Sequence, residues 1–228
     1  MNLNADFSQR AAVHPQRLDW TASPIAGVKR KMLDRIGDEI ARATTIVRYD
    51  PHSRFSPHIH TGGEEFLVMD GVFQDEHGDF PVGSYVRNPP QSHHTPGSEP
   101  GCTIFVKLWQ FDLADRTTVR IGTNKMAPTP ITGRPGVLLL PLFHDTREEV
   151  RLEIWNPGLH IEFIPQGGIE TLVLEGSFEE AGELFEPQSW LRLPAGVPLQ
   201  ITAGPTGARV WIKEGHLLQP VLHFEKQY

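Results

Sequence analysis

The sequence predicts an all-β protein built from two copies of one small β-barrel domain. Three observations lead to this fold class: strand-like runs separated by turn residues, a high content of Gly (21) and Pro (20) in 228 residues, and a set of repeated segments. Proline is hard to place in helices, because it lacks an N–H and clashes with the preceding turn. It suits short strands and tight connections. The first two observations predict the strands, and the third predicts the duplication.

Strand-like runs follow one another along most of the chain, and clusters of Gly, Pro, Asp or Ser follow most of them. This spacing is typical of β-sandwiches and β-barrels. The stretch Lys29–Ala41 is compatible with a helical turn or with a strand and turn, because Gly37 interrupts the helical pattern. The runs are Thr45–Tyr49, Glu65–Met69, Ser84–Arg87, Thr103–Trp109, Val137–Leu142, Arg151–Trp155, Thr171–Leu174, Trp190–Leu193 and Arg209–Lys213.

Three segments of the chain recur in the same order, two of them at an offset of 105 residues and one at an offset of 106. Repeats that keep their order at nearly one offset indicate an internal duplication. The chain therefore contains two copies of one β domain. The paired segments are Gly62–Gly71 with Gly167–Gly176, Ser84–Pro89 with Ser189–Pro194, and Gly101–Lys107 with Gly207–Lys213.

The duplication also predicts the domain boundaries. We expect the first domain to span residues 24–121 and the second to span residues 137–218. Residues 122–136 are rich in Pro, Gly and Thr, and are predicted to form the linker between the two domains.

Composition and charge exclude several classes of function. The formal net charge is −7, and no Lys/Arg-rich run is present, so neither nucleic acid nor an anionic membrane is an expected partner. A single cysteine, Cys102, excludes an intrachain disulfide framework and a multi-cysteine zinc site. No apolar run approaches the roughly 18 residues of a membrane span, and residues 1–25 lack the apolar core of a signal peptide. A cytoplasmic location is expected.

Four residues of the first copy form a candidate metal site. His58 and His60 share one face of a strand, because residues i and i+2 point the same way. Glu64 precedes the next apolar run, and His94 follows a later one. Three imidazoles and one carboxylate inside a barrel suit Zn²⁺, Fe²⁺, Mn²⁺, Ni²⁺ or Co²⁺ with open coordination positions. We expect one divalent metal per chain, with Zn²⁺ favoured.

The spacing of these residues resembles the two motifs of the cupin superfamily. His58-x-His60-x3-Glu64, followed by six residues and Gly71, is similar to the first motif, and Gly83-x5-Pro89-x4-His94 is similar to the second. The chain departs from the pattern near Ser53, where the opening glycine is missing, and at Gln91, where a glycine is usual. The resemblance implies two tandem cupin barrels of the double-stranded β-helix, or jelly-roll, type.

Within the superfamily, longer strings resemble the cupin half of ChrR-type anti-sigma factors. These strings are Glu39-x-Ala41-Arg42-x-Thr44, Val47–Tyr49, Gly62–Phe66, Asp75–Asp79 and Tyr85–Pro90. The resemblance covers roughly residues 24–218 and implies a regulatory role in a stress response. The helical zinc domain with which such proteins bind a sigma factor has no counterpart in this sequence, so we do not expect sigma-factor binding. The resemblance also implies a homodimer.

Two ligand assignments have a neighbouring alternative. Glu65 lies beside Glu64, and strand parity allows only one of them to face the barrel; the six-residue gap to Gly71 favours Glu64. His93 lies beside His94, and the five-residue interval from Pro89 favours His94. A one-residue bulge would reverse the second choice.

The second copy is predicted to be a scaffold without a metal. At the offset of 105 residues, the four ligand positions hold apolar residues or proline. A barrel with that lining is expected to pack a dry core or to take an apolar ligand. The substituted positions are Phe163, Pro165, Ile169 and Leu199.

The sequence leaves two functions open for the metal site. One is the sensory role described above. The other is a metal-dependent dioxygenase or related enzyme acting on a diketone, an enol or a carboxylate, since cupins with three His and one Glu include such enzymes. No catalytic residue is assigned, and a small-molecule ligand is expected in either case.

The candidates to line a pocket are Phe66, Arg87, Phe105 and Tyr85, although strand parity alone does not orient them. Arg87 would clamp a carboxylate or an enolate, or would form a surface ion pair. Cys102 is either an oxidation target or a small buried core residue.

Overall fold

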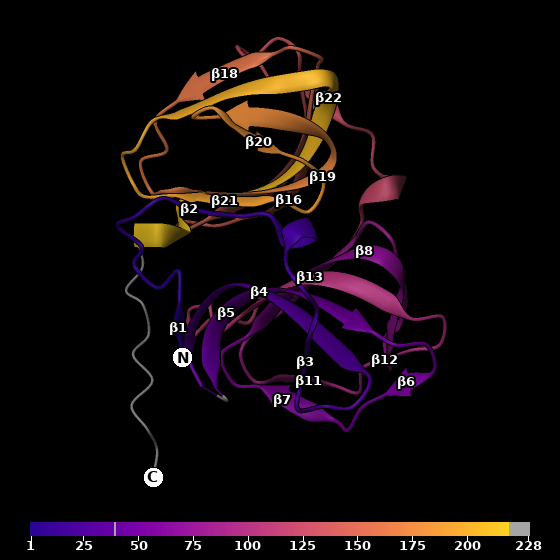
Figure 1. Cartoon of the computed structure of the whole chain (residues 1–228). Helices are drawn as coiled ribbons and strands as arrows, with labels where there is room; N and C mark the ends of the chain where they lie inside the picture. The colour runs from indigo at the N-terminus through magenta and orange to yellow at the C-terminus, as the bar shows by residue number, and fades with distance from the viewer. Residues whose placement is uncertain (39, 219–228) are drawn as a thin grey trace. The chain divides into compact units, whose positions relative to one another are not determined.

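The computed structural model describes residues 1–38 and 40–218, which divide into two compact units. The first unit comprises residues 1–5 and 19–125, and the second comprises residues 6–18 and 126–218. Each unit is a curled antiparallel sheet with short flanking strands, as the ribbon shows (Figure 1).

The first unit is built on a sheet whose strands run in the order β1-β4-β5-β13-β8-β10-β14. A separate pair, β7 and β11, lies at the end that carries the candidate site. The elements are β1 (Asn2–Leu3), β3 (Thr21–Ala22), β4 (Val28–Gly37), β5 (Ala41–Tyr49), β6 (Ser53–Arg54), β7 (His58–His60), β8 (Glu64–Asp75), β9 (Gly78–Pro81), β10 (Ser84–Asn88), β11 (Ser92–His94), β12 (Gly97–Ser98), β13 (Cys102–Leu108), β14 (Val119–Gly122) and the 3₁₀ turn η2 (Thr123–Lys125).

The second unit repeats this sheet in the order β15-β16-β17-β22-β19-β21-β2, and β18 pairs with the first part of β22. The elements are β2 (Ala11–Val13), η1 (Pro15–Arg17), β15 (Thr129–Pro130), β16 (Val137–His144), β17 (Glu149–Trp155), β18 (His160–Phe163), β19 (Ile169–Glu180), β20 (Glu183–Phe185), β21 (Trp190–Leu193), β22 (Leu199–Glu214) and η3 (His216–Leu218).

The predicted all-β fold class is confirmed; eight of the nine predicted runs lie within a strand, and the ninth, Thr103–Trp109, passes the end of β13 by one residue. The open alternative at Lys29–Ala41 is settled in favour of a strand, because β4 runs from Val28 to Gly37. Some strands are longer than the runs that predicted them. Strand β8, for example, continues through Gly71 to Asp75, where the hydrophobic pattern has already ended.

A glycine at the equivalent position allows the long central strand to continue in both copies. Gly71 in β8 and Gly176 in β19 both have a φ of +69°, in the left-handed region that favours glycine. A Cβ at either position would collide with a backbone carbonyl of the neighbouring strand, at Gly101 or at Gly207. The repeat found in the sequence therefore corresponds to a repeated backbone irregularity.

The sheets extend beyond the predicted domain bounds. Strand β2 pairs with β21 of the second unit, although it precedes the expected first domain. In the predicted linker, residues 122–136, β14 ends, η2 forms, and β15 pairs with β16. Both short edge strands, β2 and β14, cover backbone groups that would otherwise form an open sheet edge.

The interiors of the two barrels differ. In the first unit a cluster of buried apolar residues, including Phe66, Val68 and Phe73, fills the barrel beneath the candidate site. In the second unit a larger cluster, including Ile169 and Leu199, continues through the positions that correspond to the candidate site.

Candidate metal centre

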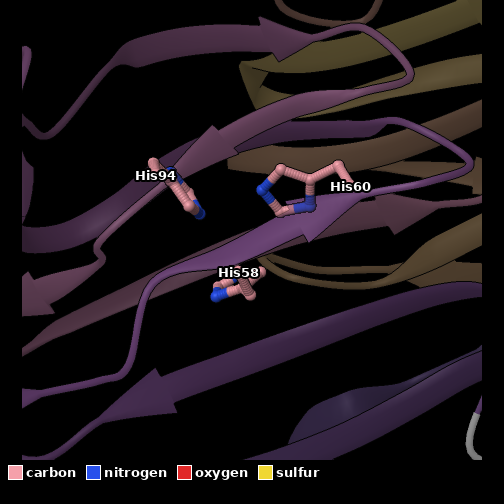
Figure 2. A group of neighbouring side chains, drawn as sticks. All are labelled: His58, His60 and His94. Carbon is pink, nitrogen blue, oxygen red and sulfur yellow. The ribbon is translucent and has the colours of Figure 1, made fainter.

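Three histidines converge at one end of the first barrel. Strands β7 and β11 pair antiparallel, so that His94 lies opposite His58, and His60 lies opposite Ser92. The three imidazoles point toward one another (Figure 2). One ligand atom from each lies within 4.8 Å of the others, and the ring centroids are 4.6–5.0 Å apart. The structure therefore gathers His58, His60 and His94 into a group that could hold a metal ion.

The structure places the competing histidine elsewhere. His93 is exposed and lies opposite Ile59, which is 59% exposed. His94, the next residue, is buried. Successive side chains of a strand point to opposite faces, so β11 directs His94 toward the cluster and His93 toward solvent.

Glu64 lies beside the histidines at the first position of β8. Its Oε2 atom is 3.4 Å from Nε2 of His60 and 3.7 Å from Nε2 of His94. Two ligand atoms that each lie 2.1 Å from a tetrahedral ion would be about 3.4 Å apart. Only small side-chain movements are therefore needed for a common ion. Glu65 lies on the opposite face of the sheet, across from Arg87 and Lys107 in the register of the strands.

Neighbouring oxygens orient two of the three imidazoles. Nδ1 of His94 lies 3.2 Å from Oδ2 of Asp75, and Nδ1 of His58 lies 3.2 Å from the carbonyl oxygen of Ser56. When each Nδ1–H donates to its oxygen, the Nε2 lone pair is left to bind a metal. The Asn88 amide donates a hydrogen bond of 3.1 Å to Glu64 Oε2.

The electrostatic environment also fits a cation. Burial lowers the pKa of His60, and the nearby charge of Glu64 only partly opposes this effect, so the ring favours the neutral, metal-binding form. Burial also disfavours charge on His94, but the hydrogen bond to Asp75 and the charge of Glu64 outweigh it and raise its pKa. For Asp75, burial is outweighed by the hydrogen bonds from His94 and His77, which lower its pKa.

One buried nitrogen without a hydrogen-bond partner tests whether these residues fit a metal. Nε2 of His60 is buried and makes no hydrogen bond within residues 1–38 and 40–218. Burying a nitrogen without a partner is unfavourable unless something else binds it. Three imidazole nitrogens and one carboxylate oxygen, all within reach of one point, are a donor set that divalent transition metals prefer. The residues present therefore fit a divalent metal.

The candidate centre adjoins a cavity of about 810 Å³, within the size range of small-molecule sites. His58, His60 and Glu64 line the cavity, so any ion that they held would face it. Most of the remaining wall is apolar, and it comes from strands of the barrel and from the loops beside them. The buried apolar residues in this wall are Val28, Ala41, Val47, Ile104 and Val106.

The predicted pocket-lining residues lie elsewhere. Phe66 packs in the buried core cluster, and Arg87, Phe105 and Tyr85 alternate with residues that face this core. None of the four lines the cavity. Arg87 donates a hydrogen bond of 2.5 Å to Asp115 Oδ2, and its guanidinium lies 4.1 Å from the centroid of the Phe111 ring. Its partners are thus residues of the chain.

The sequence did not reveal Asp75, Asn88, Tyr49 or Arg30 as site residues. The register between β8 and β10 places Asn88 opposite Glu64, and residue spacing alone does not give that register. Asp75 reaches His94 because β8 continues past Gly71. Tyr49 and Arg30 line the cavity. Tyr49 and Asp75 belong to strings that carried the ChrR resemblance, but the strings did not show that these residues lie at the site.

In the second unit, the corresponding positions contribute to an apolar core. Phe163 lies opposite Leu199, as His58 lies opposite His94. Ile169 and Leu199 are at most 1% exposed and belong to the core cluster, against which Phe163 packs.

Comparisons with known proteins identify the fold. Residues 8–112 match the family model of the ChrR cupin-like domain. A candidate dioxygenase of Nostoc punctiforme superposes with a TM-score of 0.76 at 14% identity, over 96% of this chain and 88% of that one. No curated protein sequence matches the chain.

Two further solved structures have the same architecture. A cupin 2 conserved barrel domain protein of Leptotrichia buccalis gives a TM-score of 0.60 at 10% identity, over 90% of this chain and 95% of that one. A deletion variant of the oxalate decarboxylase of Bacillus subtilis gives 0.61 at 10% identity, over 90% of this chain and 76% of that one. The chain therefore has the cupin fold, and residues 8–112 carry a ChrR cupin-like domain. Within the described residues, no helix is long and apolar enough to cross a bilayer.

Proposed function

We propose that the ChrR cupin-like domain of this chain holds one divalent metal ion with His58, His60, Glu64 and His94, and acts there on a small organic molecule. The reaction class proposed is that of metal-dependent dioxygenases. The observation that carries the proposal is the cavity of about 810 Å³ onto which three of the four ligands open. A purely structural ion is usually enclosed by four protein ligands and needs no such space.

The metal would supply Lewis-acid activation of a bound oxygen atom, and the remaining functions would fall to the chain. Asp75 holds the imidazole of His94, and Asn88 holds the carboxylate of Glu64, so two ligands are fixed before an ion arrives. The apolar wall limits the access of water to the reacting atoms.

A regulatory function is the second candidate, and the family match over residues 8–112 favours it. In this proposal the ligand is a signal, and its binding changes the conformation or the partners of the chain.

Metal content and oxygen consumption test the proposal. We expect about one equivalent of metal per chain by elemental analysis, and its loss in His94→Ala. The matched control is His93→Ala, which alters the adjacent, exposed imidazole and should retain the metal. Retention of metal in His94→Ala would contradict the ligand assignment.

Activity is tested on iron-loaded protein with a panel of diketones, enols and 2-oxo acids. Substrate-dependent oxygen uptake that His94→Ala abolishes would support the enzyme. Binding of a panel member without oxygen uptake would favour the regulatory candidate.

A further inference from the structure

The cavity beside the candidate centre has an unusual charge for this protein. The whole chain carries a formal charge of −7, yet the cavity is lined by three arginines, Arg30, Arg35 and Arg54. Among residues 1–38 and 40–218, Glu64 is the one acidic residue of the lining, and it is a candidate metal ligand. A bound divalent ion would make the lining still more positive. Such a site attracts and concentrates anions.

Two of the three arginines are accounted for by other roles. Arg35 donates a hydrogen bond to the backbone carbonyl of Asp38. The side chain of Arg54 is 87% exposed, and its closest carboxylate is Glu99, at 4.0 Å. Both therefore have a partner or free access to water.

Arg30 differs from both. It lies on β4 opposite Val47 of β5, one position along the same face from Val28. Val28 and Val47 belong to the buried core of the first unit, so the side chain of Arg30 emerges among apolar residues. Its Nε atom is buried without a hydrogen-bond partner, and within residues 1–38 and 40–218 its guanidinium makes no hydrogen bond or ion pair.

The phenol of Tyr49 does not supply the missing partner charge. Tyr49 lines the same cavity and lies opposite Val28 in the register of the strands. Burial, followed by the nearby charge of Glu64, raises its pKa well above the usual value, so the hydroxyl stays neutral. A half-buried guanidinium beside an apolar wall, with no anion paired to it among the described residues, is satisfied well by an anion from outside.

We infer that Arg30 binds the carboxylate of a small-molecule ligand whose body is apolar. This inference rests on the proposed function, because the ligand would occupy the same cavity as the substrate. A carboxylate matches the forked donors of a guanidinium, and a single unpartnered arginine favours a monoanion. The apolar wall favours an apolar body, and the volume of the cavity leaves room for a branched or aromatic group. The predicted ligand class is therefore an aryl or branched-chain carboxylic acid, of which the 2-oxo acids of the substrate panel are examples.

The test compares an acid with its uncharged analogue on zinc-loaded full-length protein, which removes redox chemistry from the measurement. The probes are phenylpyruvate and its methyl ester, with binding measured by calorimetry or NMR titration. In Arg30→Met we expect the affinity for the acid to fall at least about tenfold, as for loss of one charge-assisted hydrogen bond, while the affinity for the ester stays unchanged. Arg30→Lys should bind the acid with intermediate affinity, because it keeps the charge without the fork.

Arg54→Met is the matched control, since it removes another arginine of the same lining; there we expect less than about a twofold change. Equal acid affinity in wild type and Arg30→Met would overturn the inference, and so would a failure of the wild type to bind the acid at millimolar concentration. Zinc content is measured on the same samples. A chain without zinc that still binds the acid through Arg30 would sink the proposed metal function and leave the role of Arg30 intact.

Discussion

The two units of this chain have the same sheet but differ on one of its faces. On the face that lines the barrel, the first unit carries His58 opposite His94. The second unit carries Phe163 opposite Leu199 at the corresponding positions. The backbone pairing is preserved, and the side chains have changed from metal-binding to apolar.

The opposite face of the sheet is the same in both units. In each, a buried glutamate lies on the central strand with a buried arginine on one neighbouring strand and a buried lysine on the other. We call these sets the charge ladders; they are Arg87–Glu65–Lys107 in the first unit and Arg192–Glu170–Lys213 in the second. In each, the arginine also stacks on a phenylalanine, Phe111 or Phe7.

This difference separates residues that build the sheet from residues that serve the site. The second unit forms the same sheet without any of the four candidate ligands, so the fold does not require them. It keeps the charge ladder, although buried charges are unfavourable unless they are paired. The ladders are therefore expected to contribute to folding, and the histidines are expected to contribute to function.

The largest effect should come from breaking a ladder. Glu170 accepts hydrogen bonds from His216 and from Trp190, at 2.9 and 3.2 Å. Glu170 lies between Arg192 and Lys213 in the strand register, so Glu170→Gln removes a buried negative charge beside buried cations and should lower the free energy of unfolding by about 3–5 kcal/mol. Glu65→Gln should have a similar effect on the first unit. Chemical denaturation, followed by circular dichroism, measures both.

Glu175→Gln is the control for this prediction, because Glu175 pairs with Arg209 at the surface, where its side chain is 69% exposed. Its loss should change the free energy of unfolding by less than about 1 kcal/mol. If Glu65→Gln and Glu170→Gln were as mild as this control, the ladders would not be required for folding.

The next effect concerns the barrel-lining face of the second unit. Leu199 is 1% exposed, and Leu199→Ala leaves a cavity in the core, so unfolding should become easier by about 2–5 kcal/mol. In metal-free protein, His58→Ala in the first unit should change the free energy of unfolding by less than about 0.5 kcal/mol, since His58 is exposed. A larger loss of unfolding free energy for His58→Ala than for Leu199→Ala would contradict the proposal that the histidines serve function and the apolar residues serve folding.

The sequence predicted the strands and the repeat because both depend on local patterns. The i, i+2 spacing brought His58 and His60 to one face, and the interval from Pro89 favoured His94. Local sequence patterns do not specify the register between strands or the surroundings of each side chain. Arg87 was a reasonable choice for an anion clamp, but strand parity turns it toward Asp115, and Arg30 faces the cavity instead.

The charge ladders illustrate the same limit. All six residues were present in the repeated segments, at offsets of 105 and 106 residues. These residues become neighbours only because each arginine, glutamate and lysine lies on one of three adjacent strands, as in the order β10, β8 and β13. No local pattern in the sequence specifies this long-range pairing. The contact of Asp75 with His94 likewise depends on how far β8 extends.

Removal of the metal should affect the first unit alone. An ion that binds the folded state stabilises it by about 2.7 kcal/mol when its free concentration is a hundred times the dissociation constant. Addition of a chelator should therefore lower the unfolding temperature of the first unit and leave that of the second unchanged. We expect the two units to unfold in separate transitions, which differential scanning calorimetry would resolve. In the double variant His58→Ala/His60→Ala the chelator should have no effect, and a shift of both transitions in the wild type would argue against a single site.

The smallest effect is expected at Cys102, which corresponds to Ala208 in the second copy at the offset of 106 residues. Cys102 is 4% exposed, and burial raises the pKa of its thiol to about 11. A raised pKa keeps the thiol neutral through pH 7, and its reactivity should increase as the pH approaches 11.

At pH 8.5 the folded chain should therefore react with iodoacetamide at least roughly a hundredfold more slowly than the unfolded chain, whose thiol has a pKa near 8.5. Cys102→Ala introduces the residue of the second unit, and should change the free energy of unfolding by less than about 1.5 kcal/mol. Rapid labelling of the folded protein at pH 7 would show that the first barrel opens far more readily than its packing indicates. It would then favour a thiol-based sensory role over the metal-centred function proposed for this unit.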